Sequence, residues 1–224
     1  MPTIVLHQWE MSPFCNKVRR VLRLKQLAYE VVDYNGLLAR GVGKLSKAAT
    51  LPVLDYDGER IPDSAAIVRF LDEKHPTPPL YPVDPAARAS AHVWEDWAAQ
   101  SLYFFEIYFR MLIPQAREQA LDLLTRGRPA YERPIINLVL KRRYPKKLRA
   151  QGLGKLPPEE VERQFFGHVD ALDALLGAKP WLAGDALSIA DVSVAAQLDE
   201  VIRTSNLAPR IRQRRYVAAW LERC

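Results

Sequence analysis

Pro76-Thr77-Pro78-Pro79-Leu80-Tyr81-Pro82-Val83-Asp84-Pro85 is the stretch that divides this chain, with five prolines in ten residues. Proline lacks a backbone N–H donor and disfavours helix, so an extended linker is predicted here. Strand-like and helix-like patterns alternate before this stretch, whereas helical patterns follow it throughout. The sequence therefore predicts an α/β domain over residues 1–76, a linker over 77–85 and an all-α domain over 86–224.

The expected first domain has the element order β-α-β-(α)-β-β-α and a mixed sheet. Apolar runs at residues 3–6 and 29–34 predict strands, and apolar spacing over residues 13–27 predicts a helix with one buried face. Asp57-Gly58 lies between two further short apolar runs and indicates a tight hairpin. A helix over 63–74 completes this domain.

In the second domain, one long helix is predicted over residues 86–113. Pro157-Pro158-Glu159-Glu160 begins another, because proline and acidic residues favour a helix N-terminus. Ser188-Ile189-Ala190-Asp191 is a capping box with Asp in place of Glu, and it is expected to begin a helix that runs to Ile202.

Composition narrows the class of protein. The chain has 224 residues, of which 49% are hydrophobic and 26% charged, as in ordinary soluble proteins. No apolar run approaches the roughly 20 residues of a membrane span, and no secretory signal is visible. Two cysteines and four scattered histidines suit neither a disulfide framework nor a metal site. We expect a cytoplasmic protein without a metal or a transmembrane segment.

The net charge of +6 is a local feature of one segment. Nine basic residues and one acid between Arg126 and Arg149 give that segment +8, which leaves −2 for the rest of the chain. Such a segment is either a solvated helical face or a surface that attracts phosphates or acidic membranes. Specific nucleic-acid binding is not predicted from it.

Ser12-Pro13-Phe14-Cys15 lies at a predicted strand-to-helix junction. Ser12 occupies the N-cap position and Pro13 the first helical position. Backbone N–H groups at a helix start stabilise negative charge, so Ser12 can donate to a substrate thiolate there. Cys15 is either an acidified thiol or a small buried hydrophobic residue.

Two further short motifs carry groups that can bind a peptide-like ligand. Leu51-Pro52 enters a predicted strand, and a cis proline there leaves backbone groups free to bind a short peptide as an added strand. Asp63-Ser64 begins the next helix, where Ser64 can bind a carboxylate and Asp63 an ammonium group. Ordinary strand entry and ordinary N-capping are the alternatives.

These motifs, in this order and spacing, resemble those of the cytosolic glutathione S-transferase family. The resemblance extends over nearly the whole chain and implies a thioredoxin-like N-terminal domain followed by an all-helical C-terminal domain. The pieces that carry it are Ser12-Pro13-Phe14-Cys15-Asn16-Lys17-Val18-Arg19, Leu51-Pro52-Val53-Leu54, Asp63-Ser64-Ala65-Ala66-Ile67, Trp181-Leu182-Ala183-Gly184-Asp185 and Ser188-Ile189-Ala190-Asp191.

The resemblance implies a site for glutathione as co-substrate, a small hydrophobic electrophile as second substrate, and a homodimer. By position, Ser12 activates the glutathione sulfur. Leu51-Pro52 would bind the cysteinyl unit and Asp63-Ser64 the γ-glutamyl unit, although family members more often have Glu or Gln before that serine. Lys44 or Lys47 would bind the glycine carboxylate, in a segment that departs from the usual pattern.

Two alternatives to Ser12-dependent conjugation remain open. One makes Cys15 the nucleophile of a glutathione-dependent thiol oxidoreductase or peroxidase, although Ser12 occupies the place of the first cysteine of a C-x-x-C pair. The other is a non-catalytic adaptor that binds a protein or an anionic surface through residues 126–149. It arises because residues 147–160 resemble the failed-axon-connections and metaxin-like branch of the family, which includes membrane-associated and interaction roles.

Overall fold

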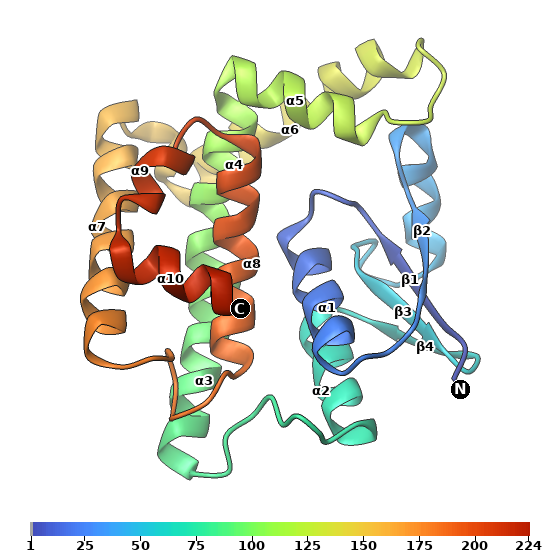
Figure 1. Cartoon of the computed structure of the whole chain (residues 1–224). Coiled ribbons are helices and arrows are strands. Elements are labelled where there is room, and N and C mark those ends of the chain that lie inside the picture. The colour runs from blue at the N-terminus through green and yellow to red at the C-terminus, as the bar shows by residue number, and fades with distance from the viewer. Residues whose placement is uncertain (1) are drawn as a thin grey trace. The chain divides into compact units, whose positions relative to one another are not determined.

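The computed structural model describes residues 2–224, which form two compact units (Figure 1). The first unit runs to Pro79 and also takes in Ala120–Leu138, and the second consists of Leu80–Gln119 and Val139–Cys224. The predicted α/β and all-α architectures are both present. The sequence predicted each domain as one continuous segment, whereas the structure groups residues 120–138 with the first unit.

A four-stranded mixed sheet forms the first unit, in the strand order β2-β1-β3-β4. β1 pairs with β2 in parallel and with β3 antiparallel, and β3 pairs antiparallel with β4. The helices α1 and α2 lie together on one side of this sheet (Figure 1). In chain order the elements are β1 (Ile4–Gln8), α1 (Pro13–Leu24), β2 (Glu30–Asp33), the 3₁₀ segment η1 (Gly36–Lys44), β3 (Val53–Tyr56), β4 (Glu59–Pro62) and α2 (Ser64–Lys74).

The ends of α1 and α2 are joined by the ammonium group of Lys25, whose side chain is fully buried. Lys25 Nζ donates to Asp72 Oδ1 at 2.8 Å and to the carbonyl oxygen of Pro78 at 2.9 Å. Because a buried charge is tolerated only when it is paired, these contacts fix the end of the sheet unit against the first residues of the proline-rich stretch.

All elements of the second unit are helical, and α8 packs against both α3 and α4. The single helix predicted over 86–113 is interrupted, because Tyr103 N–H bonds the carbonyl of Ala98, five residues back, in a π turn. The elements are α3 (Pro85–Trp97), the π segment η2 (Ala98–Leu102), α4 (Tyr103–Leu112), η3 (Leu153–Lys155), α7 (Pro158–Ala178), α8 (Ile189–Thr204), α9 (Ala208–Arg212) and α10 (Arg215–Arg223).

Two helices, α5 (Pro114–Leu124) and α6 (Glu132–Gln151), have residues in both units. Pro145 lies inside α6, where a proline removes one backbone hydrogen bond. Across residues 2–224, no helix is both long and apolar enough to span a membrane.

The capping box at the start of α8 is present as predicted, and its aspartate does more than cap. Asp191 is fully buried, and its carboxylate accepts hydrogen bonds from the backbone N–H groups of Ser188 and Leu182 at 3.0 and 2.9 Å. It also accepts one from the indole Nε1 of Trp220 in α10, at 2.9 Å. One side chain thus joins the α8 start, the preceding loop and the last helix.

Replacing Asp191 should therefore destabilise the protein more than the loss of a cap alone. We expect Asp191→Ala to lower the free energy of unfolding by about 3 kcal/mol, because buried donors lose their acceptor. Urea denaturation followed by circular dichroism measures this. The exposed Asp185→Ala is the control, and equal midpoints for the two variants would contradict the assigned role.

Candidate functional site

The sheet register brings the three predicted motifs to one end of the first unit. His7 of β1 pairs with Val53, so the C-terminal end of β1 lies beside the N-terminal end of β3. Val53 in turn pairs with Pro62, which places the C-terminal end of β4 at the same end of the sheet. Ser12, Leu51-Pro52 and Asp63-Ser64 extend from these three strand ends. Residues far apart in sequence are thereby collected on one edge.

Ser12 is the N-cap of α1, as the sequence predicts. Its Oγ accepts a long hydrogen bond of 3.4 Å from the backbone N–H of Cys15, and its backbone has extended dihedral angles. Because Oγ accepts here, the hydroxyl proton remains available to a further acceptor. Ser12 is 9% exposed, so it lies just below the surface at the positive end of the helix dipole.

Cys15 lies in the first turn of α1 and is fully buried, at 0% exposure. It belongs to an apolar cluster with Val42, Leu51 and Val53, against which the side chain of Trp9 also packs. A thiol in such surroundings is shielded from water and from solutes. The geometry therefore fits the small buried hydrophobic residue rather than an accessible nucleophile.

Leu51 and Pro52 are buried immediately before β3, and the peptide bond between them is cis, as predicted. Leu51 shares the apolar cluster of Cys15, which connects this loop to the start of α1. The contact between these two segments fixes the loop next to the Ser12 cap.

Asp63 caps α2, and one of its carboxylate oxygens accepts both capping hydrogen bonds. Its Oδ1 accepts from the N–H groups of Ala65 and Ala66 at 2.8 and 3.1 Å, and the side chain is exposed. The backbone of Asp63 has a φ of 76°, a value that is costly for any residue with a Cβ. Ser64 follows it and is buried at the helix start. An exposed carboxylate thus adjoins a helix N-terminus, the arrangement suited to an ammonium and a carboxylate side by side.

Lys44 ends η1, and both Lys44 and Lys47 are exposed. Val42, two residues before Lys44, packs in the cluster of Cys15 and Leu51, so η1 returns to the same end of the sheet. Neither lysine forms an ion pair with any residue in the described part of the chain. Both remain candidates for binding an anionic group.

The sequence did not indicate that residues 120–138 contact the sheet unit near this edge. Arg126 pairs with Glu10 at 2.8 Å, two residues before the Ser12 cap, and the Asn35 side chain donates to the Arg126 carbonyl at 3.2 Å. The α5–α6 connection therefore borders the β1–α1 loop. The only signal in the sequence was a lone acid, Glu132, within a run of basic residues.

Glu132 is buried and holds the segment after β2. Its Oε2 accepts from the Leu37 N–H at 2.7 Å, and its Oε1 pairs with Arg128 at 2.6 Å. Arg128 and the Leu37 N–H hold the pKa of the Glu132 carboxyl below its usual range. Gly36 has a φ of 57°, and a Cβ there would lie 1.9 Å from Glu132 Oε2, so only glycine fits.

The remaining basic residues of segment 126–149 divide into two groups. Arg133 pairs with Asp122, and Lys147 Nζ contacts the Tyr103 hydroxyl at 3.2 Å and lies 4.7 Å from the centre of that ring. The other group is exposed on α6 and consists of Lys141, Arg142, Arg143, Lys146 and Arg149.

No cluster of metal-ligating side chains occurs within residues 2–224.

Comparison with known families agrees with this architecture. The family model described as glutathione S-transferase, N-terminal domain, matches residues 6–79, and glutathione S-transferase, C-terminal domain, matches residues 114–223. Together the two matches span most of the chain. The protein belongs to the glutathione S-transferase superfamily.

Its relatives include proteins whose names state an activity and proteins whose names do not. Failed axon connections of Drosophila melanogaster is 27% identical over 200 residues, which cover 85% of this chain but only 46% of that protein. Maleylacetoacetate isomerase of Pseudomonas aeruginosa is 27% identical over 205 residues, 86% of this chain and 79% of the enzyme. FzlA from C. crescentus has the same fold, with a TM-score of 0.68 at 22% identity over 98% of this chain and 86% of that one.

Removing the Glu132 carboxylate should loosen the α5–α6 connection. We expect Glu132→Ala to speed cleavage by trypsin after Arg126 several-fold, because a loop without its anchor opens more often. Timed digestion with mass spectrometry of the fragments measures it. Glu59→Ala, an exposed residue of β4, is the control, and indistinguishable cleavage rates for the two variants would refute the anchor.

Proposed function

We propose that this protein is a glutathione transferase that conjugates reduced glutathione to small hydrophobic electrophiles. The observation that carries the proposal is the gathering of Ser12, Leu51-Pro52 and Asp63-Ser64 at one end of the sheet, with Ser12 at the positive end of α1. A hydroxyl donor at the positive end of a helix dipole stabilises a thiolate. Membership of the superfamily supports glutathione as the co-substrate.

In this mechanism the glutathione thiol loses its proton to solvent, and Ser12 donates a hydrogen bond to the resulting thiolate. The sulfur lone pair then forms a C–S bond to the electrophilic carbon. In a substitution, the leaving group departs with its bonding electrons, and in an addition, the carbon that receives the electrons takes a proton from water. Ser12 acts by lowering the pKa of the thiol, so that more thiolate is present at neutral pH.

The remaining contacts bind and orient the tripeptide. The free carboxylate oxygen of Asp63 would accept from the γ-glutamyl ammonium, while Ser64 at the start of α2 would bind the neighbouring carboxylate. Lys44 would pair with the glycine carboxylate from the end of η1, and Leu51 would contact the cysteinyl unit. Each charged or polar group of the tripeptide would thus have a partner of opposite charge or a complementary hydrogen-bonding group.

The comparison of Ser12 with Cys15 tests this assignment. We expect Ser12→Ala to lower the conjugation rate at pH 7 by about ten- to hundredfold, because one hydrogen bond to a thiolate contributes about 1.5–3 kcal/mol. The deficit should narrow as pH rises, since free thiolate becomes abundant. Cys15→Ala should retain most of the activity. Initial rates with an aromatic chloro-dinitro electrophile across pH measure both.

The opposite result would replace the proposal. If Cys15→Ala is the inactive variant and a mixed disulfide between Cys15 and glutathione is found by mass spectrometry, the protein is a thiol oxidoreductase. The full burial of Cys15 is the observation against that outcome.

A second candidate function is a non-catalytic adaptor, and the exposed cations of α6 favour it. Arg142, Lys146 and Arg149 recur at spacings of four and three residues and therefore share one face of the helix. A row of exposed positive charge of this kind suits an anionic partner. This function does not require the tripeptide site at all.

Titration with reduced glutathione by calorimetry distinguishes the two functions. A transferase should bind glutathione, and Asp63→Asn should weaken binding about five- to tenfold, because the amide keeps the α2 cap but loses the charge that faces the ammonium. Asp84→Asn is the matched control, since Asp84 caps α3 through the same kind of bond, to Ala87 N–H at 2.8 Å. Absence of binding to the unmodified protein would leave the adaptor function.

A further inference from the structure

Lys147 differs from the other lysines of α6 in what its amino group contacts. Its Nζ lies 3.2 Å from the hydroxyl oxygen of Tyr103 in α4, 4.7 Å from the centre of the Tyr103 ring and 5.5 Å from that of Phe104. Lys141 and Lys146 are exposed, and neither has a hydrogen bond or an ion pair within residues 2–224. The amino group of Lys147 is thus the one on this helix that lies against aromatic rings and a hydroxyl group.

The acids on this side of the helical unit do not pair with Lys147. Glu106 of α4 interacts with it electrostatically, but the Glu106 carboxylate is bonded to Arg110, at 2.7 and 2.9 Å. Glu200 of α8, which faces Glu106, is paired with Arg203 at 2.8 Å. Within the described part of the chain, Lys147 therefore has no carboxylate partner of its own.

Lys147 is exposed, although its amino group lies against the rings. This partial burial lowers the pKa of Lys147, and the guanidinium of Arg143 lowers it as well, while Tyr144 and Glu106 act in the opposite direction. Burial raises the pKa of Tyr103, so that its hydroxyl keeps its proton at pH 7. The neutral amine is thus more abundant at Lys147 than at an ordinary lysine, and a protonated hydroxyl lies beside it.

An amine of this kind reacts with carbonyl compounds. Lysines that are desolvated, or that lie next to another cation, are the ones that form imines with carbonyl substrates in enzymes. A hydroxyl within hydrogen-bond reach of the amine can pass protons to and from the reacting oxygen. Lys147 and Tyr103 together supply both groups.

Arg143 adds a second cation beside Lys147. It is exposed, lies four residues earlier on the same side of α6, and forms no ion pair with any residue from 2 to 224. Its guanidinium is therefore available to a carboxylate. Arg143 and Lys147 each follow by one position a member of the row formed by Arg142 and Lys146, so they lie roughly 100° further round the helix. The pair is thus separate from the row that favours an adaptor.

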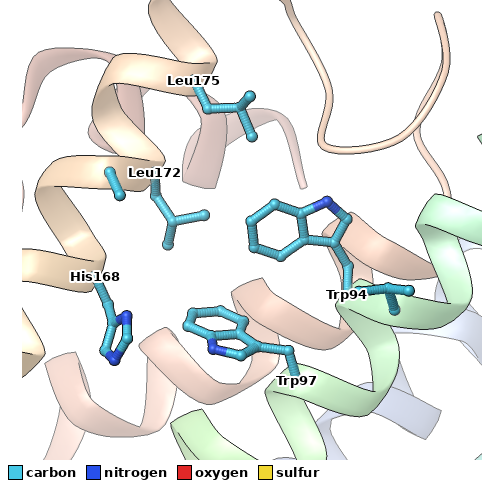
Figure 2. Close-up of a pocket in the computed structure, with 7 residues that line it drawn as sticks. Trp94, Trp97, His168, Leu172 and Leu175 are labelled. Carbon is cyan, nitrogen blue, oxygen red and sulfur yellow. The ribbon is translucent and has the colours of Figure 1, made fainter.

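We propose that Lys147 forms an imine with a small aldehyde that carries a carboxylate group, with Arg143 binding the carboxylate and Tyr103 transferring protons. The site shares no residue with the apolar pocket that the tryptophans of α3 and the leucines of α7 line (Figure 2). It needs neither glutathione nor the residues around Ser12.

The reaction proceeds in two steps and balances without an oxidant or a reductant. In the first step the amine lone pair forms a C–N bond to the aldehyde carbon, the carbonyl oxygen takes the proton of the Tyr103 hydroxyl, and the nitrogen returns a proton to Tyr103. In the second step the new hydroxyl group leaves as water with a proton from Tyr103, and the nitrogen lone pair forms the C=N bond. The nitrogen then gives its remaining proton back to Tyr103.

Trapping with glyoxylate and cyanoborohydride tests the proposal on the full chain. Cyanoborohydride reduces the imine, so each lysine that has reacted becomes carboxymethyl-lysine, which peptide mapping by mass spectrometry locates. At pH 7 we expect Lys147 to be labelled at least about fivefold faster than Lys146, the matched lysine without contacts. Tyr103→Phe keeps the ring but removes the hydroxyl, and it should slow labelling of Lys147 about tenfold and leave Lys146 unchanged.

Acetaldehyde, which is uncharged, tests the preference for a carboxylate. Arg143→Gln should reduce the ratio of glyoxylate to acetaldehyde labelling at Lys147 by about threefold or more. Arg142→Gln, one position earlier and on the other row, is the control and should leave this ratio unchanged.

Equal labelling of Lys147 and Lys146 would overturn the proposal, since the rings and the hydroxyl would then only stabilise the ammonium group. That comparison uses the unmodified chain and stays decisive if Tyr103→Phe fails to fold. Equal ratios in the two arginine variants would overturn the choice of an anionic aldehyde. Glutathione takes no part in these reactions, so their outcome is independent of the transferase function.

Discussion

The two-residue turn at Asp57-Gly58 sets the geometry on which the candidate site depends. Both residues have positive φ, 50° and 87°, as a tight turn between antiparallel strands requires. Thr3 also exchanges hydrogen bonds with Asp57, donating to its side chain at 2.8 Å and accepting from its N–H at 3.0 Å. One turn therefore fixes the register of β3 against β4 and connects β1 to both.

That register decides which chemical groups meet. A shift of one residue would turn every side chain of the strand to the other face, so the apolar residues Leu54 and Ile61, which pair with each other, also hold it in place. With the register fixed, Pro52 and Asp63, which flank the paired Val53 and Pro62, are neighbours. The site is thus a consequence of strand pairing: motifs that are far apart in sequence meet because their strands end at the same end of the sheet.

What could be predicted from the sequence was local. The Ser12 cap, the Asp57-Gly58 turn and the box at Ser188 and Asp191 are each encoded by two to four adjacent residues, and all three are present. The bond between Glu132 and Leu37 joins positions 95 residues apart. Glu132 is conspicuous as a lone acid among basic residues, but no local pattern identifies Leu37 as its partner. The π turn after Trp97 was not predicted for another reason. Apolar spacing indicates which face of a helix is buried, but it does not show whether a backbone N–H bonds the carbonyl four or five residues back.

The position of the helix start explains why Ser12 and Cys15 lie in different surroundings. An N-cap residue lies outside the helix, so its side chain remains at the helix end, where the dipole acts. Three residues later the backbone is already helical, and the Cys15 side chain points into the apolar cluster of Val42 and Leu51. A sequence motif of four residues therefore contains two chemically reactive groups, and the helix start places Ser12 at the cap while it buries Cys15 completely.

The residues that hold the fold are distinct from those that would carry the chemistry. Asp191, Lys25 and Glu132 are buried and paired within the structure. The exposed carboxylate of Asp63 and the hydroxyl proton of Ser12 take little part in packing. A chain can consequently keep this architecture while its site residues change, which is consistent with a superfamily that includes both a maleylacetoacetate isomerase and failed axon connections. Likeness of fold therefore identifies the scaffold, and the groups at the end of the sheet determine whether a thiolate is activated there.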